Sequence, residues 1–265
     1  MATGTERPIY ADEVGIAFGR HGDVVLRSAF QPLYAPQQGQ LRAVAVESFL
    51  RPFRDGTPIA PRPFLEALDE RERTSVERLA VEMHSHNHSH LDIVGLDHVL
   101  GVSRFAPPAW LRRSAGDTVR PIASVRLVSG LTVLPAWLAG AGLPIMLGSV
   151  GDAAPDPAII RSAKPAIVRL GGAWFRRICD SQQATRLLRT LVSGLRRDGY
   201  KVAVEGIQTR RQLAAALDVG ADLLQGFLLA RPELVGTAAT RETIELASQL
   251  SGGGTAVPLS GEGRS

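Results

Sequence analysis

Two glutamates stand where apolar stretches of the sequence end. Glu47 follows the run "LRAVAV", and Glu205 follows "YKVAV" and is itself followed at once by Gly206. A carboxylate in such a place can belong to a site at the edge of a sheet. It can equally be a charge that leaves the sheet for water, and for either glutamate alone this second interpretation is favoured. The residues that neighbouring strands bring to the same place decide between the two.

Apolar, β-branched runs alternate along the chain with segments of helical periodicity. Ser75–His84 is predicted to be a helix because Val76, Leu79, Ala80 and Met83 fall on one face. Further helices are predicted at Ala184–Leu195, Arg210–Leu217 and Thr240–Leu250. The predicted strands are Ala29–Leu33, Leu41–Leu50, Leu91–Leu96, Ile122–Val128, Pro144–Val150, Ala166–Leu170, Lys201–Val204 and Asp222–Leu224.

This alternation predicts an α/β fold, since strands separated by helices pair in parallel through right-handed crossovers. With about eight strands, a TIM-like (β/α)8 barrel is the leading architecture, and an open doubly wound sheet is the second. We expect an N-terminal lead-in over residues 1–20, a barrel domain over 21–250 and a disordered, glycine- and serine-rich tail over 251–265. Functional groups of such a barrel lie at the carboxyl ends of its strands, where Glu47 and Glu205 both fall.

Size and composition fit one such domain in a reducing cytosol. The chain has 265 residues, of which 45% are hydrophobic, and its single cysteine, Cys179, cannot form an internal disulfide. It has no apolar run of about 18 residues or more and no signal peptide at its start, so we expect a cytoplasmic protein without a membrane span. The net charge of +4 comes mostly from scattered arginines, and nucleic-acid binding is not expected.

Four histidines in the run "HSHNHSH" are a second group with possible chemistry. On a helix, His84 would pair with His88 or His86 with His90, whereas on a strand all four would point the same way. Histidine is the commonest transition-metal ligand. The run nevertheless joins a predicted helix to a predicted strand on the side away from the expected mouth of the barrel. We therefore interpret it as a solvated connecting turn in preference to a metal site.

Five motifs occur in the order of a known family. They are "FQPLY" (Phe30–Tyr34), "VESFLRP" (Val46–Pro52), "GTPIAPRPFL" (Gly56–Leu65), "VAVEGIQT" (Val202–Thr209) and "LLQGFLLARP" (Leu223–Pro232). In this order the chain, over roughly residues 15 to 245, resembles an EAL domain, the bacterial domain that hydrolyses cyclic di-GMP. The resemblance implies a barrel whose first strand is antiparallel. It also implies that active members bind two Mg²⁺ or Mn²⁺ ions, which activate a water molecule to cleave one phosphodiester bond.

Several residues match functional positions of the family. The resemblance makes Glu47 the counterpart of a metal ligand and Arg51 the counterpart of an arginine that grips a substrate phosphate. Gln31, Glu205 and Gln225 match residues that face the substrate or the metals. These five positions, with Arg169, are the remnant site that the sequence predicts.

Other functional positions of the family carry different residues here. The expected asparagine of the third strand is Gly95, the paired aspartates after the fifth strand are Gly148 and Ser149, and the lysine of the sixth strand is Arg169. The aspartate two residues after that lysine is Gly171, and the second glutamate of the "EGVE" pattern is Gln208.

One observation is independent of this alignment. Between Thr118 and Gly151 the chain has no Asp or Glu, although this stretch holds two of the strands that should donate carboxylates. Asp152 follows in a loop, but one residue does not replace three ligands, and Mg²⁺ requires carboxylates in near-octahedral positions. We therefore expect a degenerate EAL domain, without bound Mg²⁺ or Mn²⁺ and without phosphodiesterase activity.

Glu47 and Glu205 would then face each other without the cations that compensate their charge. Arg169 has a planar, permanently charged fork that can bridge two carboxylates, and we expect it to take over the neutralising role of the metals. Three functions remain open. They are regulation through an unidentified protein partner, metal-independent binding of cyclic di-GMP through Arg51, Gln31 and Gln225, and, last, weak phosphodiesterase activity.

Overall fold

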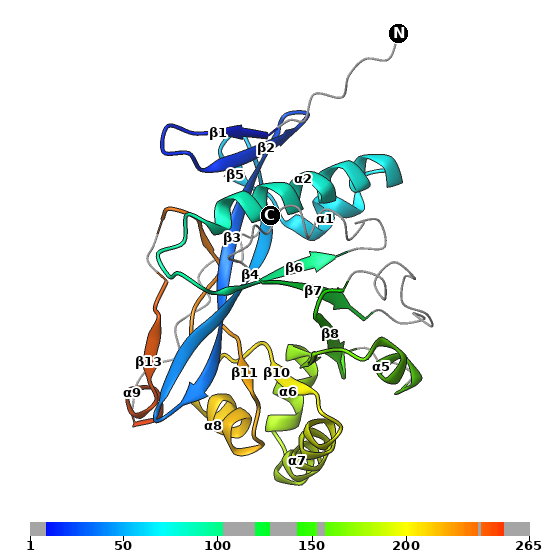
Figure 1. Ribbon diagram of the computed structural model, residues 1–265, viewed down its shortest axis with the longest axis vertical. Coiled ribbons are helices and arrows are strands. Elements are labelled where there is room, and N and C mark those ends of the chain that lie inside the picture. The colour runs from blue at the N-terminus through cyan, green and yellow to red at the C-terminus, as the bar shows by residue number, and fades with distance from the viewer. Residues whose placement is uncertain (1–8, 103–119, 128–141, 153–156, 238–239, 252–265) are drawn as a thin grey trace, which may run out of the picture.

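The computed structural model describes residues 9–102, 120–127, 142–152, 157–237 and 240–251. Its centre is a ring of eight strands with helices around it (Figure 1). The ring consists of β3 (Val24–Gln37), β4 (Gln40–Arg54), β6 (Asp97–Val102), β7 (Pro121–Arg126), β8 (Ile145–Val150), β9 (Ile167–Leu170), β10 (Lys201–Val204) and β11 (Leu223–Leu224).

The first strand of the ring, β3, runs against both of its neighbours. It forms a long antiparallel hairpin with β4 and closes the barrel by pairing with β11, where Tyr34 lies opposite Leu224. From β4 to β11 every pairing around the ring is parallel. The predicted barrel with an antiparallel first strand is thus confirmed, and the open doubly wound sheet is wrong.

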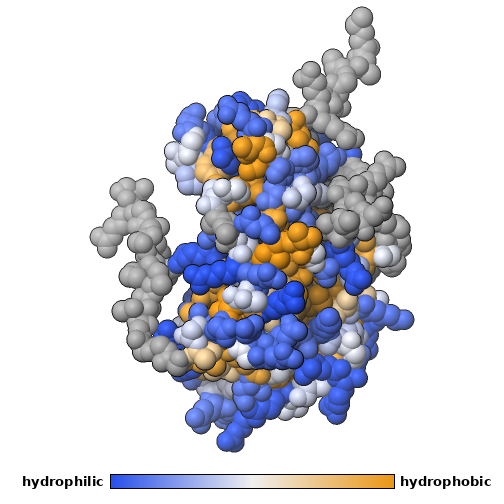
Figure 2. Space-filling model, turned by 60° about the vertical axis from the view of Figure 1, so that its left-hand side comes forward, coloured by the Kyte–Doolittle hydropathy of each residue, from blue (hydrophilic) through white to orange (hydrophobic). Residues whose placement is uncertain are grey.

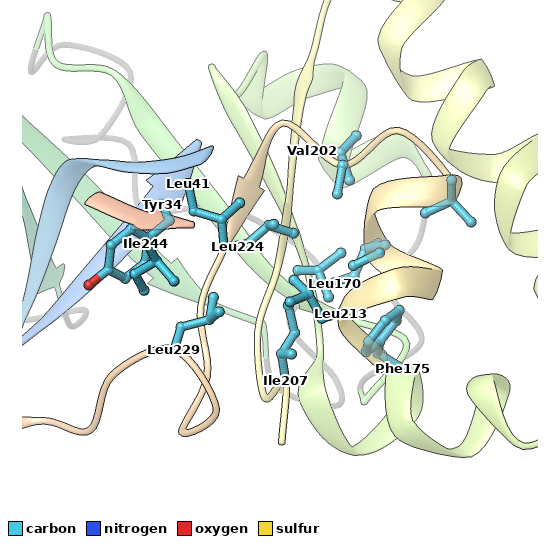
Figure 3. Packing of buried hydrophobic residues seen from close by; sticks show 14 of the residues in the cluster. Tyr34, Leu41, Leu170, Phe175, Val202, Ile207, Leu213, Leu224, Leu229 and Ile244 are labelled. Carbon is cyan, nitrogen blue, oxygen red and sulfur yellow. The ribbon is translucent and has the colours of Figure 1, made fainter. Parts of the chain in front are cut away.

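The interior of the barrel is filled by one apolar side chain from each strand, a layer of the kind that makes such barrels a packed core. This layer consists of Leu33, Ala45, Val99, Ile122, Met146, Ile167, Ala203 and Leu223. A larger cluster lies between the barrel wall and the helices, where Leu170 and Ile207 pack against Leu213 and Phe175 (Figure 3). Both layers hold the strand ends in fixed positions relative to one another.

Two of the described helices begin with a capping box. Asp69 and Glu72 form a reciprocal capping box at the start of α2, and Thr209 and Gln212 do the same for α8. Each box satisfies amide groups that a helix start leaves unpaired. The helices are α1 (Pro61–Glu66), α2 (Glu70–His88), α5 (Pro157–Ala163), α6 (Gly172–Cys179), α7 (Gln182–Arg197), α8 (Arg210–Asp218) and α9 (Leu246–Ser251).

Short strands extend the sheet outside the ring. They are β1 (Ile9–Ala11), β2 (Ala17–His21), β5 (Thr57–Pro58), β12 (Glu233–Leu234) and β13 (Thr243–Glu245). From Ile9 onward, the segment expected as a lead-in therefore forms two strands, and β2 pairs with β3. The expected tail lies outside the described residues from 252 onward, and Ser251 is the last residue of α9.

Three local predictions are wrong. Leu91–Leu96 is not a strand, since the third strand of the ring begins only at Asp97. The first half of the predicted helix Thr240–Leu250 is β13, which pairs with β4. The histidine run is not a solvated turn throughout, because α2 continues to His88.

None of the described helices is long and apolar enough to cross a membrane. On the face seen in Figure 2, most of the surface is hydrophilic, and apolar residues gather in a patch near the middle.

Candidate functional site

Four predicted site residues meet at the carboxyl ends of the barrel strands. Arg169 on β9 donates from Nη1 to Glu47 Oε1 at 2.8 Å, and the same nitrogen lies 3.6 Å from Glu205 Oε2. Gln225, directly after β11, donates to Glu47 Oε2 at 3.1 Å. A single guanidinium therefore bridges the two carboxylates, and an amide satisfies the second oxygen of Glu47.

Glu205 is held in this position by the strand-to-loop turn that follows β10. Gly206 has a φ of +74°, a conformation that favours glycine, and its Cα lies close to the start of α6. The turn brings Glu205 Oε1 within 2.8 Å of the Ser149 hydroxyl and 3.3 Å of the Gly172 amide, which both donate to it. The carboxylate is thus fixed by a hydroxyl, an amide and a guanidinium.

Arg169 is enclosed, with 4% of its surface exposed. Burial acts to lower the pKa of its guanidinium, but the nearby charges of Glu47 and Glu205 outweigh burial, and the pKa is raised. The group therefore stays charged. Its Nε and Nη2 atoms are also buried, and they have no hydrogen-bond partner among the described residues.

The other two predicted residues do not join this carboxylate–arginine cluster. Gln31 lies opposite Glu47 in the β3–β4 pairing, but its amide donates to the Ala230 carbonyl at 2.9 Å. Arg51 lies further along β4, over the ring of Phe49, and donates to the Leu50 carbonyl. Partial burial lowers the pKa of Arg51.

Above the cluster lies an open cavity of about 440 Å³. Gln31, Glu47, Arg51, Arg169, Glu205 and Gln225 all line it, so the structure brings all six predicted residues to one place. Arg126 and Arg176 line it as well. Neither was predicted to be a site residue. Arg126 lies inside the predicted strand Ile122–Val128, but the observed strand β7 ends at Arg126, which therefore stands at the carboxyl end of the barrel.

A second cavity, of about 360 Å³, lies beside the first, between α2 and the ends of β4, β6 and β7. The two cavities share Glu47, Phe49, Arg51 and Arg126. Glu77 of α2 lines the second cavity, and its Oε1 accepts from Arg73. Its Oε2 atom is buried and has no hydrogen-bond partner within the described part of the chain. No sequence signal distinguished Glu77 from the other charged residues of α2.

Two of the positions that the sequence predicts to lack metal ligands, Gly148 and Gly171, are sterically crowded. A Cβ atom on Gly148 would lie 2.7 Å from the Cβ of Arg169, so a longer side chain at 148 does not fit beside this arginine. A Cβ on Gly171 would lie 2.5 Å from Asp152 Cγ. Asp152 itself accepts from the Trp174 amide at 2.6 Å in the first turn of α6, away from the carboxylate–arginine cluster.

The third-strand position needs a correction. Gly95 was expected to stand there, but it lies in the loop before β6, with a φ of +82°. The residues of β6 that border the second cavity are Gly101 and Val102. Neither of them, nor Gly95, has a side-chain oxygen.

Comparison with known proteins agrees with the barrel fold. Residues 128–232 match the sequence profile of the EAL domain. No curated protein matches the chain. Among solved structures, the fold is similar to Klebsiella pneumoniae BlrP1 in complex with calcium and cyclic diGMP. The TM-score is 0.67 and the identity 17%, covering 83% of this chain and 58% of BlrP1.

Two further structures show the same fold. BlrP1 with FMN and cyclic diGMP and without metal ions has a TM-score of 0.63 at 17% identity, covering 83% of this chain and 56% of that one. The FimX EAL domain from Pseudomonas aeruginosa, bound to c-di-GMP, has a TM-score of 0.61 at 16% identity, covering 78% and 90%. The chain spans less than two thirds of BlrP1. It therefore has the fold of solved EAL domains, and residues 128–232 carry the sequence pattern of the EAL family.

Proposed function

We propose that this chain is an EAL-type domain that does not hydrolyse cyclic di-GMP and that acts as a bacterial signalling regulator by binding. The observation that carries the proposal is Arg169 Nη1, which lies 2.8 Å from Glu47 and 3.6 Å from Glu205. A permanent cation thus occupies the space between the two carboxylates on which metal binding would depend.

The residues present do not fit a pair of divalent cations. Mg²⁺ prefers carboxylate and water oxygens in octahedral positions, and a buried guanidinium beside the same carboxylates repels it. Glu47 uses both of its oxygens, toward Arg169 and Gln225. In the described part of the chain, no group of three or more acidic, histidine or cysteine side chains is placed to hold a metal.

Regulation through a protein partner remains the first candidate, because a domain without catalysis transmits a signal only by what it binds. One observation in its favour is an apolar stripe on α7. Leu187 and Leu191 stand one helical turn apart and are 69% and 38% exposed, which is unusual for leucine.

Metal-independent binding of cyclic di-GMP is the second candidate, and the cavities supply an observation for it. Arg51, Arg126 and Arg176 border the cavity above the cluster and can hold phosphate oxygens. Glu77 Oε2 in the adjoining cavity, which no described residue engages, can accept from an N–H group of a base. The BlrP1 structure without metal ions also contains cyclic diGMP.

Calorimetric titration with cyclic di-GMP, with and without Mg²⁺, separates these functions when the product is analysed in parallel. We expect no linear dinucleotide under either condition, and its appearance would show that the proposed inactivity is wrong. Heat that is equal with and without Mg²⁺ supports the receptor, and it should be reduced in Arg51→Ala. The absence of heat supports the protein-partner function.

A further inference from the structure

A buried cluster of three histidines lies where the end of α2 packs against the barrel. His84 and His88 come from α2 and His98 from β6, and their exposed fractions are 5%, 6% and 1%. All three rings contact Phe30 of β3, with centroid distances between 5.8 and 6.4 Å. The rings of His88 and His98 stack at 4.6 Å. The cluster therefore spans the contact between a helix and two strands.

Serine hydroxyls form hydrogen bonds with two of these rings. His84 Nδ1 lies 2.8 Å from the Ser28 hydroxyl, and His98 Nε2 lies 3.2 Å from the Ser48 hydroxyl. Ser48 is the residue next to Glu47, so His98 is linked to the strand that carries the mouth carboxylate. The third ring, His88, has a buried Nε2 atom that has no hydrogen-bond partner among the residues that the structure describes. Neutral imidazoles can form both of these hydrogen bonds, because a hydroxyl group can either donate to a ring nitrogen or accept from one.

The same end of α2 also holds the strand β2. Asn87 donates to the Ala17 carbonyl at 2.8 Å and accepts from the Ala17 amide at 2.7 Å, and it donates to Ser28 at 3.0 Å. Asn87 lies between His84 and His88 in the sequence of α2. Movement of this helix end away from β3 and β6 therefore breaks its hydrogen bonds to Ala17, at the start of β2, while the rest of β2 stays paired with β3.

The groups around the cluster oppose a positive charge. Burial lowers the pKa of His84 to about 3, with a further contribution from Arg51 of β4. Burial also lowers the pKa of His88, against a hydrogen bond to the Leu96 backbone, and that of His98, whose neighbours His88 and His84 add to the effect. Facing groups on the other elements are Ser28 and Phe30 of β3.

Three nearby acids have other partners. Asp97 precedes His98 in β6 and so faces the opposite side of the strand, where Arg120 and Lys201 act on it. Glu72 pairs with His21 of β2 at the far end of α2. Glu77 of α2 lies about two helical turns before His84 and lines the same cavity, but its Oε1 accepts from Arg73.

We propose that His84, His88 and His98 form a proton-sensitive latch, which holds the end of α2 against the barrel at neutral pH and releases it in mildly acidic solution. His84 and Arg51 both line the 360 Å³ cavity, so release of α2 opens the wall of that cavity. The latch stands on the packing of the three rings and does not depend on the function proposed for the mouth.

The sign of the effect follows from linkage. A histidine that is exposed when α2 opens titrates near pH 6.5, whereas the same ring in the closed cluster resists protonation. The open form therefore binds more protons, so the closed form is fully stable above about pH 6.5 and loses stability as the pH falls below it.

Hydrogen exchange read by mass spectrometry tests the latch, at about pH 7.5 and about pH 5.5, with times corrected for the intrinsic exchange rate. Protection of the amides in α2 should fall about tenfold for each histidine that takes up a proton on opening. Protection of β9 and β10 should stay unchanged. An equal loss in α2 and in these strands would mean global acid unfolding and would overturn the proposal.

Two histidine variants, one inside the cluster and one outside it, sharpen the test. His98→Gln keeps a donor for Ser48 but cannot be protonated, so the acid-induced loss in α2 should shrink by up to about tenfold. His86→Gln is the matched control, because His86 is an exposed histidine of the same helix, and it should leave the loss unchanged. Equal losses in His98→Gln and wild type would contradict the latch.

A measurement on wild type alone keeps the proposal open to refutation if His98→Gln does not fold. NMR titration of the imidazole signals should show that His84 and His98 stay neutral until protection of α2 is lost. Protonation of His84 or His98 with α2 still fully protected would rule out the latch.

Discussion

At the scale of single residues, Arg169 determines what the mouth of the barrel can hold. Its replacement by alanine leaves Glu47 and Glu205 facing each other with no cation between them. Breaking a buried ion pair from one side costs about 3–5 kcal/mol, because the remaining charge stays buried and unpaired. We expect Arg169→Ala to lose stability of this order in urea unfolding and to have a lower melting temperature than wild type.

Two controls separate this role from a general loss of packing. Arg176→Ala removes a partly exposed arginine of the same cavity and should cost less than about 1 kcal/mol. Mg²⁺ should leave the melting temperature of wild type unchanged, since the guanidinium already lies between the carboxylates. A clear Mg²⁺-dependent rise in wild type would refute the neutralising role of Arg169.

At the scale of elements, the turn after β10 joins three parts of the site. Gly206 combines a φ of +74° with a close approach to α6, and a Cβ there would lie 2.8 Å from Gly172 Cα and 2.7 Å from Arg176 Nη1. Gly206→Ala must therefore push the start of α6 away from Glu205. We expect it to destabilise the fold by about 1–2 kcal/mol from the left-handed backbone and by a further amount from the clash.

Gly199 provides the matched control for this turn. It has a φ of +90°, before β10, but a Cβ there would meet no atom within 4 Å. Gly199→Ala thus carries only the backbone cost. Urea unfolding of both variants should show the larger loss for Gly206→Ala, and equal losses would mean that the approach of α6 adds nothing.

The strands show how much of the fold and of the site can be predicted from the sequence. The order of motifs is enough to place Glu47, Arg169, Glu205 and Gln225 together, because strand ends of a barrel meet at one face. The predicted strand Leu91–Leu96 is wrong because the β-propensity of a residue reflects the burial of its side chain more than a preference of its backbone. The actual strand, β6, begins at a charged residue, Asp97.

The histidines and the second cavity mark the limit of sequence reasoning. Polar residues are expected at the surface, yet His84, His88 and His98 are buried, where Ser28 and Ser48 bind two of them. These serines lie on strands that are distant in sequence from the histidines, so no local sequence pattern predicts the contacts. The same holds for Glu77, whose place at a cavity depends on how α2 crosses the strand ends.

At the scale of the whole molecule, the barrel depends on one short seam, where β11 pairs with β3. Tyr34 stands at this seam opposite Leu224, is fully buried, and lies beside Leu41 and Ile244 in the core (Figure 3). Its hydroxyl donates to the Arg241 carbonyl at 3.0 Å. The chain thus closes its barrel through a buried phenol that is also tied to the segment before β13.

Closure should therefore weaken in alkaline solution. Burial raises the pKa of Tyr34 to about 12, with Arg241 acting to lower it and Glu233 to raise it. An unfolded tyrosine titrates near pH 10, so the unfolded chain loses this proton first. The contribution of Tyr34 to stability is complete below about pH 10 and is lost as the pH rises toward 12.

Urea unfolding at about pH 9 and about pH 11 tests this contribution. Tyr34→Phe keeps the packing and removes the hydroxyl, at a cost near about 1 kcal/mol at neutral pH, but it cannot ionise. Its unfolding midpoint should fall less than that of wild type between the two pH values. Tyr10→Phe, at a ring that is 49% exposed, should behave as wild type. If Tyr34→Phe loses as much as wild type, ionisation at the seam does not limit the alkaline stability of the barrel.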